Sequence, residues 1–148
     1  GLHDMAQIHP NNPIPFDIYK NSIISWVSVS LPGNSDKVFI NQSTFNPVLH
    51  FHPLIFNGHQ HTIKYFKEYG FESYDWLFDE YCDKLTQEDN WRRLVYNIAD
   101  VQKVMNMGRD NLVDIITQNK DSLERNRNLL VQCKSIERII TKFYETTI

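Results

Sequence analysis

The residues of this chain best placed to bind a ligand are small polar residues that follow two apolar segments, residues 23–30 and 54–56. If these segments are parallel strands, their carboxyl ends meet at one edge of the sheet, where open α/β sheets bind their ligands. The polar residues that follow the segments are Asn34, Ser35, Asn57, Gly58, His59 and Gln60. Gly58 has no Cβ and allows a ligand to approach the backbone closely.

A second group, Gln42, Ser43 and Thr44, stands at the start of a predicted helix. The backbone N–H groups and the dipole at a helix N-terminus favour a phosphate group. Together the two groups predict a binding site for a phosphorylated ligand at one edge of the sheet.

Four histidines, at positions 50, 52, 59 and 61, form two His-x-His pairs, a spacing that occurs in zinc sites. Residues two positions apart do not share a helix face, however. We therefore predict that His50 and His52 cap the end of one helix, that His59 and His61 line a polar turn, and that none of them holds a metal.

Two groups of charged residues have two interpretations each. The acidic residues could form a metal or general-base site, but solvated carboxylates with Asp75 as a helix cap are the preferred interpretation. The basic residues could contact phosphates or cover a solvated helix face. The two groups are Asp75, Asp79, Glu80 and Asp83, and Arg92, Arg93, Lys103 and Arg109.

The pattern of apolar residues predicts the elements that would position these side chains. Residues 23–30 are β-branched and aromatic, which is typical of a strand, and residues 54–56 are a short apolar run typical of a strand buried on both faces. Between them, a helix with Pro47 in its first turn ends before Pro53, and its apolar face is Phe45, Val48, Leu49 and Phe51.

A second helix follows, with Ile63, Tyr65, Phe66 and Tyr69 as apolar positions and Gly70 as its C′ residue. Residues 88–107 predict a third helix, which Gly108 ends, and its apolar positions are Trp91, Leu94, Val95, Ile98, Val101 and Val104. Residues 110–144 predict further helix, interrupted at residues 119–122 by polar residues that favour caps.

These elements predict an α/β fold in which helices flank a small parallel sheet and the carboxyl-terminal third is helical. We expect an extended arm over residues 1–15, a Rossmann-like α/β domain over residues 16–108, and a helical segment over residues 109–148 that packs on it.

Composition narrows the classes of function. The chain has 148 residues, of which 41% are hydrophobic, so it can bury a core. Its net charge of −3 gives no electrostatic reason to bind nucleic acid, and no apolar run approaches the roughly 20 residues that cross a bilayer. The two cysteines lie far apart and predict a reducing, cytoplasmic location rather than a disulfide framework.

Several segments resemble a known family. Residues 41–48 (NQSTFNPV), 53–58 (PLIFNG), 62–71 (TIKYFKEYGF) and 79–83 (DEYCD) are similar to T-E-K-T-F/W-K-P-I, P-F-I-x-x-G, T-L-K-Y-L-K-x-L-G-F and D-E-S-Y-D. These motifs belong to the carboxyl-terminal, donor-binding half of viral and bacterial glycosyltransferases with two Rossmann-like domains, distantly similar to fucosyltransferases. The resemblance implies a half domain that binds a nucleotide sugar as its ligand.

The chain departs from the family where the first helix begins. Gln42 and Ser43 stand where the family has Glu and Lys, the charged residues expected to meet the sugar nucleotide. The lost lysine would have neutralised a diphosphate leaving group. We therefore expect no useful sugar transfer by this chain alone.

Two functions follow from these observations. The first is a glycosyltransferase-like domain that binds a nucleotide sugar and is incomplete or weakly active alone. The alternative is a degenerate, non-catalytic module for protein binding or assembly, with the apolar-striped carboxyl-terminal helices pairing with a partner protein or with a second copy.

Overall fold

The computed structural model describes residues 16–28 and 42–132. The predicted arm over residues 1–15, the candidate site residues Asn34 and Ser35, and the predicted helix beyond residue 132 lie outside the described residues.

Two short parallel strands form the sheet. β1 (Ser25–Ser28) pairs with β2 (Leu54–Asn57) in a register that places Ser25 opposite Leu54 and Ser28 opposite Asn57. Leu54, Ile55 and Phe56 are buried, as a strand covered on both faces requires. The predicted α/β fold with a small parallel sheet is therefore confirmed, and both strands end at the same edge.

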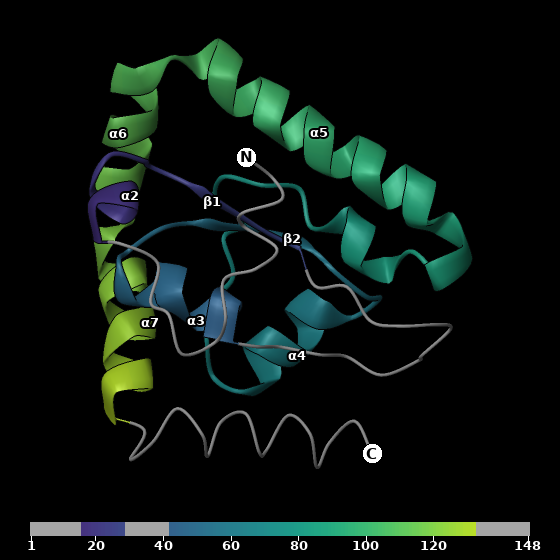
Figure 1. The fold of residues 1–148 in the computed structure, drawn as a ribbon, viewed down its shortest axis with the longest axis horizontal. Helices are drawn as coiled ribbons and strands as arrows, with labels where there is room; N and C mark the ends of the chain where they lie inside the picture. Colours follow the sequence, from purple (N-terminus) through teal and green to yellow (C-terminus); the bar gives the residue numbers. More distant parts are fainter. Residues whose placement is uncertain (1–15, 29–41, 133–148) are drawn as a thin grey trace.

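Helices surround the sheet (Figure 1). α5 lies along one side of the sheet, where it contacts β2, and α3 contacts both strands and α7. The helical segments are α2 (Phe16–Lys20), α3 (Gln42–Leu49), α4 (Thr62–Glu68), the 3₁₀ turns η1 (Tyr81–Lys84) and η2 (Gln87–Asp89), α5 (Asn90–Met107), α6 (Arg109–Gln118) and α7 (Lys120–Gln132). The carboxyl-terminal part of the described chain is helical, as predicted.

The end of α3 differs from the prediction. Pro47 is the sixth residue of the helix and not part of its first turn, so its missing N–H removes a bond inside the helix. The helix ends two residues later, and the Pro47 carbonyl accepts bonds from the N–H groups of His50 (3.1 Å) and His52 (3.0 Å). Phe51, expected on the apolar helix face, has a φ of 60° and is exposed.

Two predicted helix ends are confirmed. α4 stops at Glu68, and Gly70 follows with a φ of 96°, a conformation that glycine adopts easily. Asn119 separates α6 from α7, and its side-chain amide donates a bond of 2.9 Å to the carbonyl of Ile115. Both breaks follow from the local chemistry of these residues.

The core lies between β2, α3, α4 and the segment that follows α4. The ring of Phe66 stacks on that of Phe71, with centroids 4.6 Å apart, and both side chains are buried. Leu112 of α6 and Leu123 and Leu130 of α7 complete the core from the carboxyl-terminal side. Burial of this apolar cluster is the main stabilising term for the fold.

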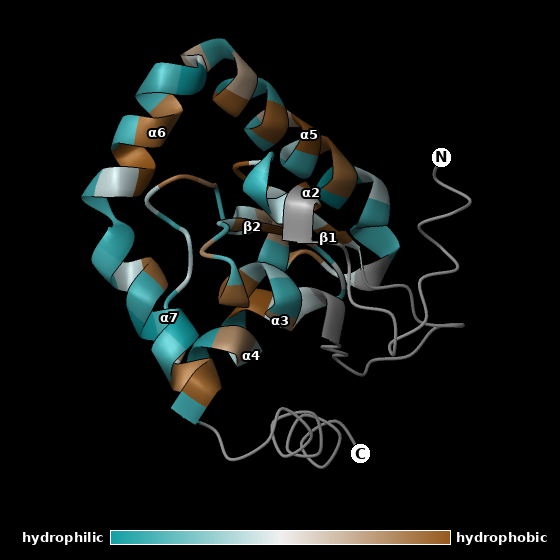
Figure 2. Cartoon of the chain, turned by 60° about the vertical axis from the view of Figure 1, so that its left-hand side comes forward, coloured by the Kyte–Doolittle hydropathy of each residue, from teal (hydrophilic) through white to brown (hydrophobic). Residues whose placement is uncertain are grey.

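α5 packs with its polar side inward. Its buried residues are Arg93, Asn97, Asp100 and Val104. Four apolar side chains face outward instead, namely Trp91 (74% exposed), Val95 (48%), Ile98 (45%) and Met105 (74%). Figure 2 shows hydrophobic stretches along α5 that alternate with hydrophilic ones. Among the described residues, no helix combines the length and apolar character needed to cross a membrane.

Candidate functional site

The two strands bring polar side chains together at their carboxyl ends. The Asn57 side-chain amide donates a hydrogen bond of 3.1 Å to the Ser28 hydroxyl oxygen, and the Trp26 indole N–H donates to the same oxygen at 2.8 Å. This juxtaposition follows from the parallel register, since Ser28 and Asn57 are partners in the sheet. A ligand at this edge would meet an amide and a hydroxyl that already bond to each other.

The loop between β2 and α4 is held by side chains from elsewhere in the fold. Arg93 of α5 donates hydrogen bonds to the carbonyls of Gly58 and Leu85. The Gln60 side-chain amide donates to the Lys84 carbonyl at 2.8 Å. The predicted ligand-binding loop is therefore fastened to α5 and η1 by its own polar groups.

Asn97 of α5 donates a bond of 3.2 Å to the Phe56 carbonyl, one position before the end of β2. The outer edge of β2 faces α5, and an unpaired carbonyl buried there would be costly. Asn97 and Arg93 therefore take the role that a third strand has in a larger sheet.

The glycine at position 58 has a local explanation. A Cβ there would approach the Thr62 hydroxyl oxygen to 3.1 Å, and that hydroxyl donates a bond of 2.7 Å to the His59 carbonyl. His59 itself is buried. The close contact at Gly58 thus comes from the first turn of α4, whatever ligand approaches the loop.

A carboxylate of the protein occupies the N-terminus of α4. The two oxygens of Asp83 accept bonds from the N–H groups of Ile63 (2.8 Å) and Lys64 (3.0 Å). Burial raises the pKa of Asp83, while these two backbone bonds and the nearby Arg93 guanidinium oppose that shift. Asp83 is therefore placed where a phosphate would bind in many α/β folds.

His50 and His52, which were predicted to cap a helix end, both contact Tyr19 of α2. The His50 ring stacks on Tyr19 with centroids 4.4 Å apart. The His52 ring is buried, with Nε2 2.8 Å from the Tyr19 carbonyl and Nδ1 2.8 Å from the Ser25 hydroxyl. A carbonyl can only accept, so Nε2 carries a hydrogen, and burial lowers the pKa of the ring. His52 joins α2 to β1, so its side chain is not a helix cap as predicted.

Each of the four acidic candidate residues has its own structural environment. An Asp79 oxygen accepts a bond of 2.8 Å from the Tyr81 N–H, and an oxygen of Glu80 lies 3.5 Å from the Lys67 ammonium group. Asp75 is exposed, and Asp83 caps α4. Within residues 16–28 and 42–132, no three histidine, cysteine or carboxylate side chains group as metal ligands would.

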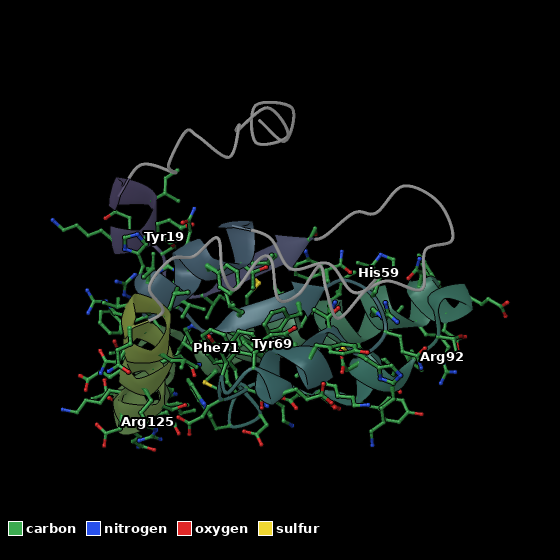
Figure 3. The ribbon with its side chains drawn as sticks, turned by 90° about the horizontal axis from the view of Figure 1, so that it is seen from below. Tyr19, His59, Tyr69, Phe71, Arg92 and Arg125 are labelled. Atoms are coloured by element: carbon green, nitrogen blue, oxygen red, sulfur yellow. The ribbon has the colours of Figure 1, made fainter. Side chains whose placement is uncertain are left out.

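The four basic candidate residues differ in whether their side chains already bond to the protein. Arg93 is buried on backbone carbonyls, and the Lys103 ammonium group donates a bond of 2.9 Å to the Leu77 carbonyl. Arg92 and Arg109 are exposed, and Arg92 lies at the edge of the molecule in Figure 3, far from Arg125 on α7. The buried arginine therefore stabilises the loop after β2 from within the fold.

The first turn of α3 contains the remaining candidate residues. Gln42 and Ser43 are its first two residues, and Thr44 follows them. The Thr44 side chain is fully buried, and its hydroxyl has no hydrogen-bond partner. Thr44, one of the three candidate residues in this turn, is therefore inside the fold and not on its surface.

A surface groove of about 820 Å³ runs along α4 and η1. It is lined by His61, three lysines and four carboxylates, among them Lys67 and Glu80, which pair with each other. Charges of both signs nearly balance there, so the groove has no net attraction for a diphosphate.

The residues that fasten the loop carried only a weak sequence signal. Arg93, Asn97 and Asp100 recur at the spacing of one helix face. That spacing marks a polar face of α5, but nothing in it shows that this face is the buried one. Asp83 lies 20 positions after Ile63 and 19 after Lys64, the residues whose N–H groups it caps, and has no local signal.

Comparison with known proteins adds no family assignment. The chain matches no protein-family model, and neither the curated proteins nor the solved structures include a significant match to it.

Proposed function

We propose that this chain is a non-catalytic α/β module that binds another polypeptide through the outer face of α5. The observation that carries the proposal is the reversed burial of that helix, which presents Trp91, Val95, Ile98 and Met105 to solvent while Arg93 and Asn97 are buried. Large exposed apolar patches on folded proteins mark interaction sites.

The state of the predicted ligand loop supports the same proposal. Gly58 and Gln60 already bond to Arg93 and to the Lys84 carbonyl, and the Asp83 carboxylate fills the N-terminus of α4. A nucleotide sugar would have to displace these bonds, and Ser43 offers no positive charge to compensate. Little remains at this loop to stabilise a transferred sugar.

The test is site-specific photo-cross-linking in cells that make the full-length protein. A photoreactive residue replaces Ile98, and the matched control replaces Val113, which is exposed on α6 to a similar degree (45% and 41%). We expect discrete cross-linked polypeptides from position 98 and none from position 113. Each cross-linked polypeptide is then purified, and Trp91→Ala should weaken its binding by at least about tenfold.

The proposal fails if position 98 cross-links no more than position 113, or if Trp91→Ala leaves the affinity unchanged. It also fails if the chain alone transfers sugar efficiently from a panel of nucleotide sugars to simple acceptors.

A nucleotide-sugar site is the second candidate, because the two parallel strands bring Ser28 and Asn57 together at their carboxyl ends. Open α/β sheets bind ligands at such an edge, and a helix N-terminus such as that of α3 favours a phosphate group. A thermal-shift screen against nucleotide sugars tests it, since a ligand of the folded state raises Tm. Ser43→Glu should abolish the shift, whereas Asn111→Glu on α6 should keep it.

A further inference from the structure

The exposed apolar side chains of α5 follow a regular spacing. Trp91, Val95, Ile98 and Met105 are separated by four, three and seven positions, with the exposed Gln102 between the last two. This is the alternation of four and three that places residues in a single seam between packed helices. We call these five residues the α5 seam.

The seam is free of charge. Between Arg92 and Lys103, the exposed residues of α5 are Val95, Ile98, Ala99 and Gln102. The one carboxylate in that stretch, Asp100, is on the buried side, where it accepts a bond of 3.1 Å from the Asp79 N–H. No described element lies on the outer side of α5 (Figure 1). The seam can therefore pack against another helix without burying an unpaired charge.

The seam is also nearly symmetric about its centre. Ile98 is seven positions from both Trp91 and Met105, and Val95 and Gln102 flank it at three and four positions. A two-fold axis close to Ile98 would place Trp91 of one copy beside Met105 of the other. An interface of this kind uses the same patch on both copies, as the commonest protein dimers do.

Charge complementarity fixes the direction of the two helices. At the amino-terminal end of α5, the acidic residues Glu88 and Asp89 outnumber the basic Arg92. At its carboxyl-terminal end, the basic residues Lys103 and Arg109 outnumber the acidic Asp110. Antiparallel helices bring the acidic end of one copy to the basic end of the other, and their dipoles oppose favourably. Parallel helices would place like charges side by side at both ends.

We infer that a second copy of this chain covers the α5 seam, in an antiparallel α5–α5 contact with its two-fold axis near Ile98. The inference rests on the proposed function and names the partner. α5 is roughly 27 Å long at 1.5 Å per residue, and a buried tryptophan alone contributes about 150–250 Å². Such a contact falls at the small end of stable interfaces, so we expect a dissociation constant in roughly the micromolar range.

The test is sedimentation velocity on the full chain at about 1 to 200 µM, with three variants. The unchanged chain should form a dimer as its concentration rises. Ile98→Glu should weaken the dimer by at least about tenfold, because it places two carboxylates together at the axis. Val113→Glu, at an exposed apolar position outside the seam, should dimerise as the unchanged chain does.

Mixing Ile98→Glu with Ile98→Lys tests the symmetry directly. Each variant alone should be monomeric, and the mixture should dimerise, because only a two-fold axis near Ile98 places the opposite charges together. Circular dichroism confirms that each variant is folded, and Met105→Glu replaces Ile98→Glu if the latter is unfolded. A monomeric unchanged chain, or an Ile98→Glu chain that dimerises normally, overturns the inference.

These outcomes are distinct from a failure of the proposed function. If the chain is monomeric but position 98 cross-links to another polypeptide, the second copy is the wrong partner and the binding role of α5 stands. If position 98 cross-links nothing and the chain is monomeric, both proposals fail.

Discussion

α5 and α7 are two long helices of this chain that pack in opposite ways. α7 buries Leu123 and Leu130 and exposes most of its polar residues, as an amphipathic helix on a core does. α5 buries Arg93 and Asn97 and exposes Trp91. Both helices have apolar residues at helical spacing, so the difference comes from the surfaces on which they pack.

The two surfaces differ in their free backbone groups. α7 packs against α3, a helix whose free carbonyls lie at its end, and there Arg127 Nε donates a bond of 3.2 Å to the Leu49 carbonyl. α5 packs along β2 and donates to the carbonyls of Phe56 in β2 and of Gly58 just after the strand. Buried carbonyls need donors, so a helix beside a strand edge has to place polar side chains there.

A second side chain of α7 also bonds the backbone of a neighbouring segment. The Asn126 side chain accepts a bond of 2.7 Å from the Glu72 N–H and donates one of 2.8 Å to the Glu72 carbonyl. Its partner, Glu72, lies outside any helix or strand and again has backbone groups free to bond with a side chain. In both helices, the buried polar side chains therefore lie where the neighbouring segment has unpaired backbone groups.

The largest effect on stability should come from the apolar face of α7. Leu130→Ala removes a side chain that is 1% exposed, so we expect the free energy of unfolding to fall by about 2 to 5 kcal/mol. Trp91→Ala on α5 should change it by less than about 0.5 kcal/mol, because that side chain is mostly in solvent. Urea denaturation at low protein concentration measures both. A larger loss for Trp91→Ala would show that the contrast between the helices is wrong.

The next effect concerns the polar face of α5. Arg93→Met keeps much of the side-chain volume but leaves the carbonyls of Gly58 and Leu85 without their donor, so we expect a loss of about 2 to 4 kcal/mol. Arg92→Met is the matched control at the neighbouring exposed position and should be nearly neutral. Equal unfolding midpoints for the two variants would contradict the role of Arg93 at the edge of β2.

A smaller loss of stability is expected when the buried asparagine of either helix is replaced. Asn97→Ala and Asn126→Ala each remove hydrogen bonds to buried or partly buried backbone groups, which predicts losses of about 1 to 3 kcal/mol. Native-state hydrogen exchange distinguishes the two, because Asn97→Ala should release protection near β2 and Asn126→Ala near Glu72. If both variants lost protection in the same segment, the two asparagines would not stabilise separate segments.

The smallest effect concerns Asp100, the buried carboxylate of α5. Burial raises the pKa of Asp100 above the ordinary 3.8, so the folded state binds this proton more tightly than the unfolded state does. Stability therefore falls as the pH rises through the window between 3.8 and the raised value. Asp100→Asn should remove this dependence and slightly stabilise the protein at neutral pH.

Thermal unfolding of the unchanged chain and of Asp100→Asn across that window is the measurement. Asp114→Asn, at an exposed position on α6, is the control for the loss of one carboxylate. Identical profiles for Asp100→Asn and the unchanged chain would show that Asp100 is not desolvated in the folded protein.

The sequence by itself predicted the local elements. The apolar segment at residues 23–30 contains β1, and the segment at residues 54–56 forms all of β2 but its last residue, Asn57. Gly70, Gly108 and Asn119 mark helix ends where the structure has them. These features depend on side-chain shape, backbone freedom and capping within a few residues, which a single sequence contains. The carboxyl ends of β1 and β2 meet as the parallel pairing predicted. The predicted site at that edge stays a prediction.

Only the tertiary structure decided which groups fill the space around those elements. Asp83 caps a helix that begins about twenty residues earlier, His52 connects α2 to β1, and Arg93 donates to a loop 35 positions away. Leu123 and Leu130 of α7 face the core, whereas four apolar side chains of α5 face solvent and Val104 is the one apolar side chain of that helix that is fully buried. The reason is physical: periodicity shows that a helix has two faces, and the unpaired backbone groups of its neighbour determine which face is buried.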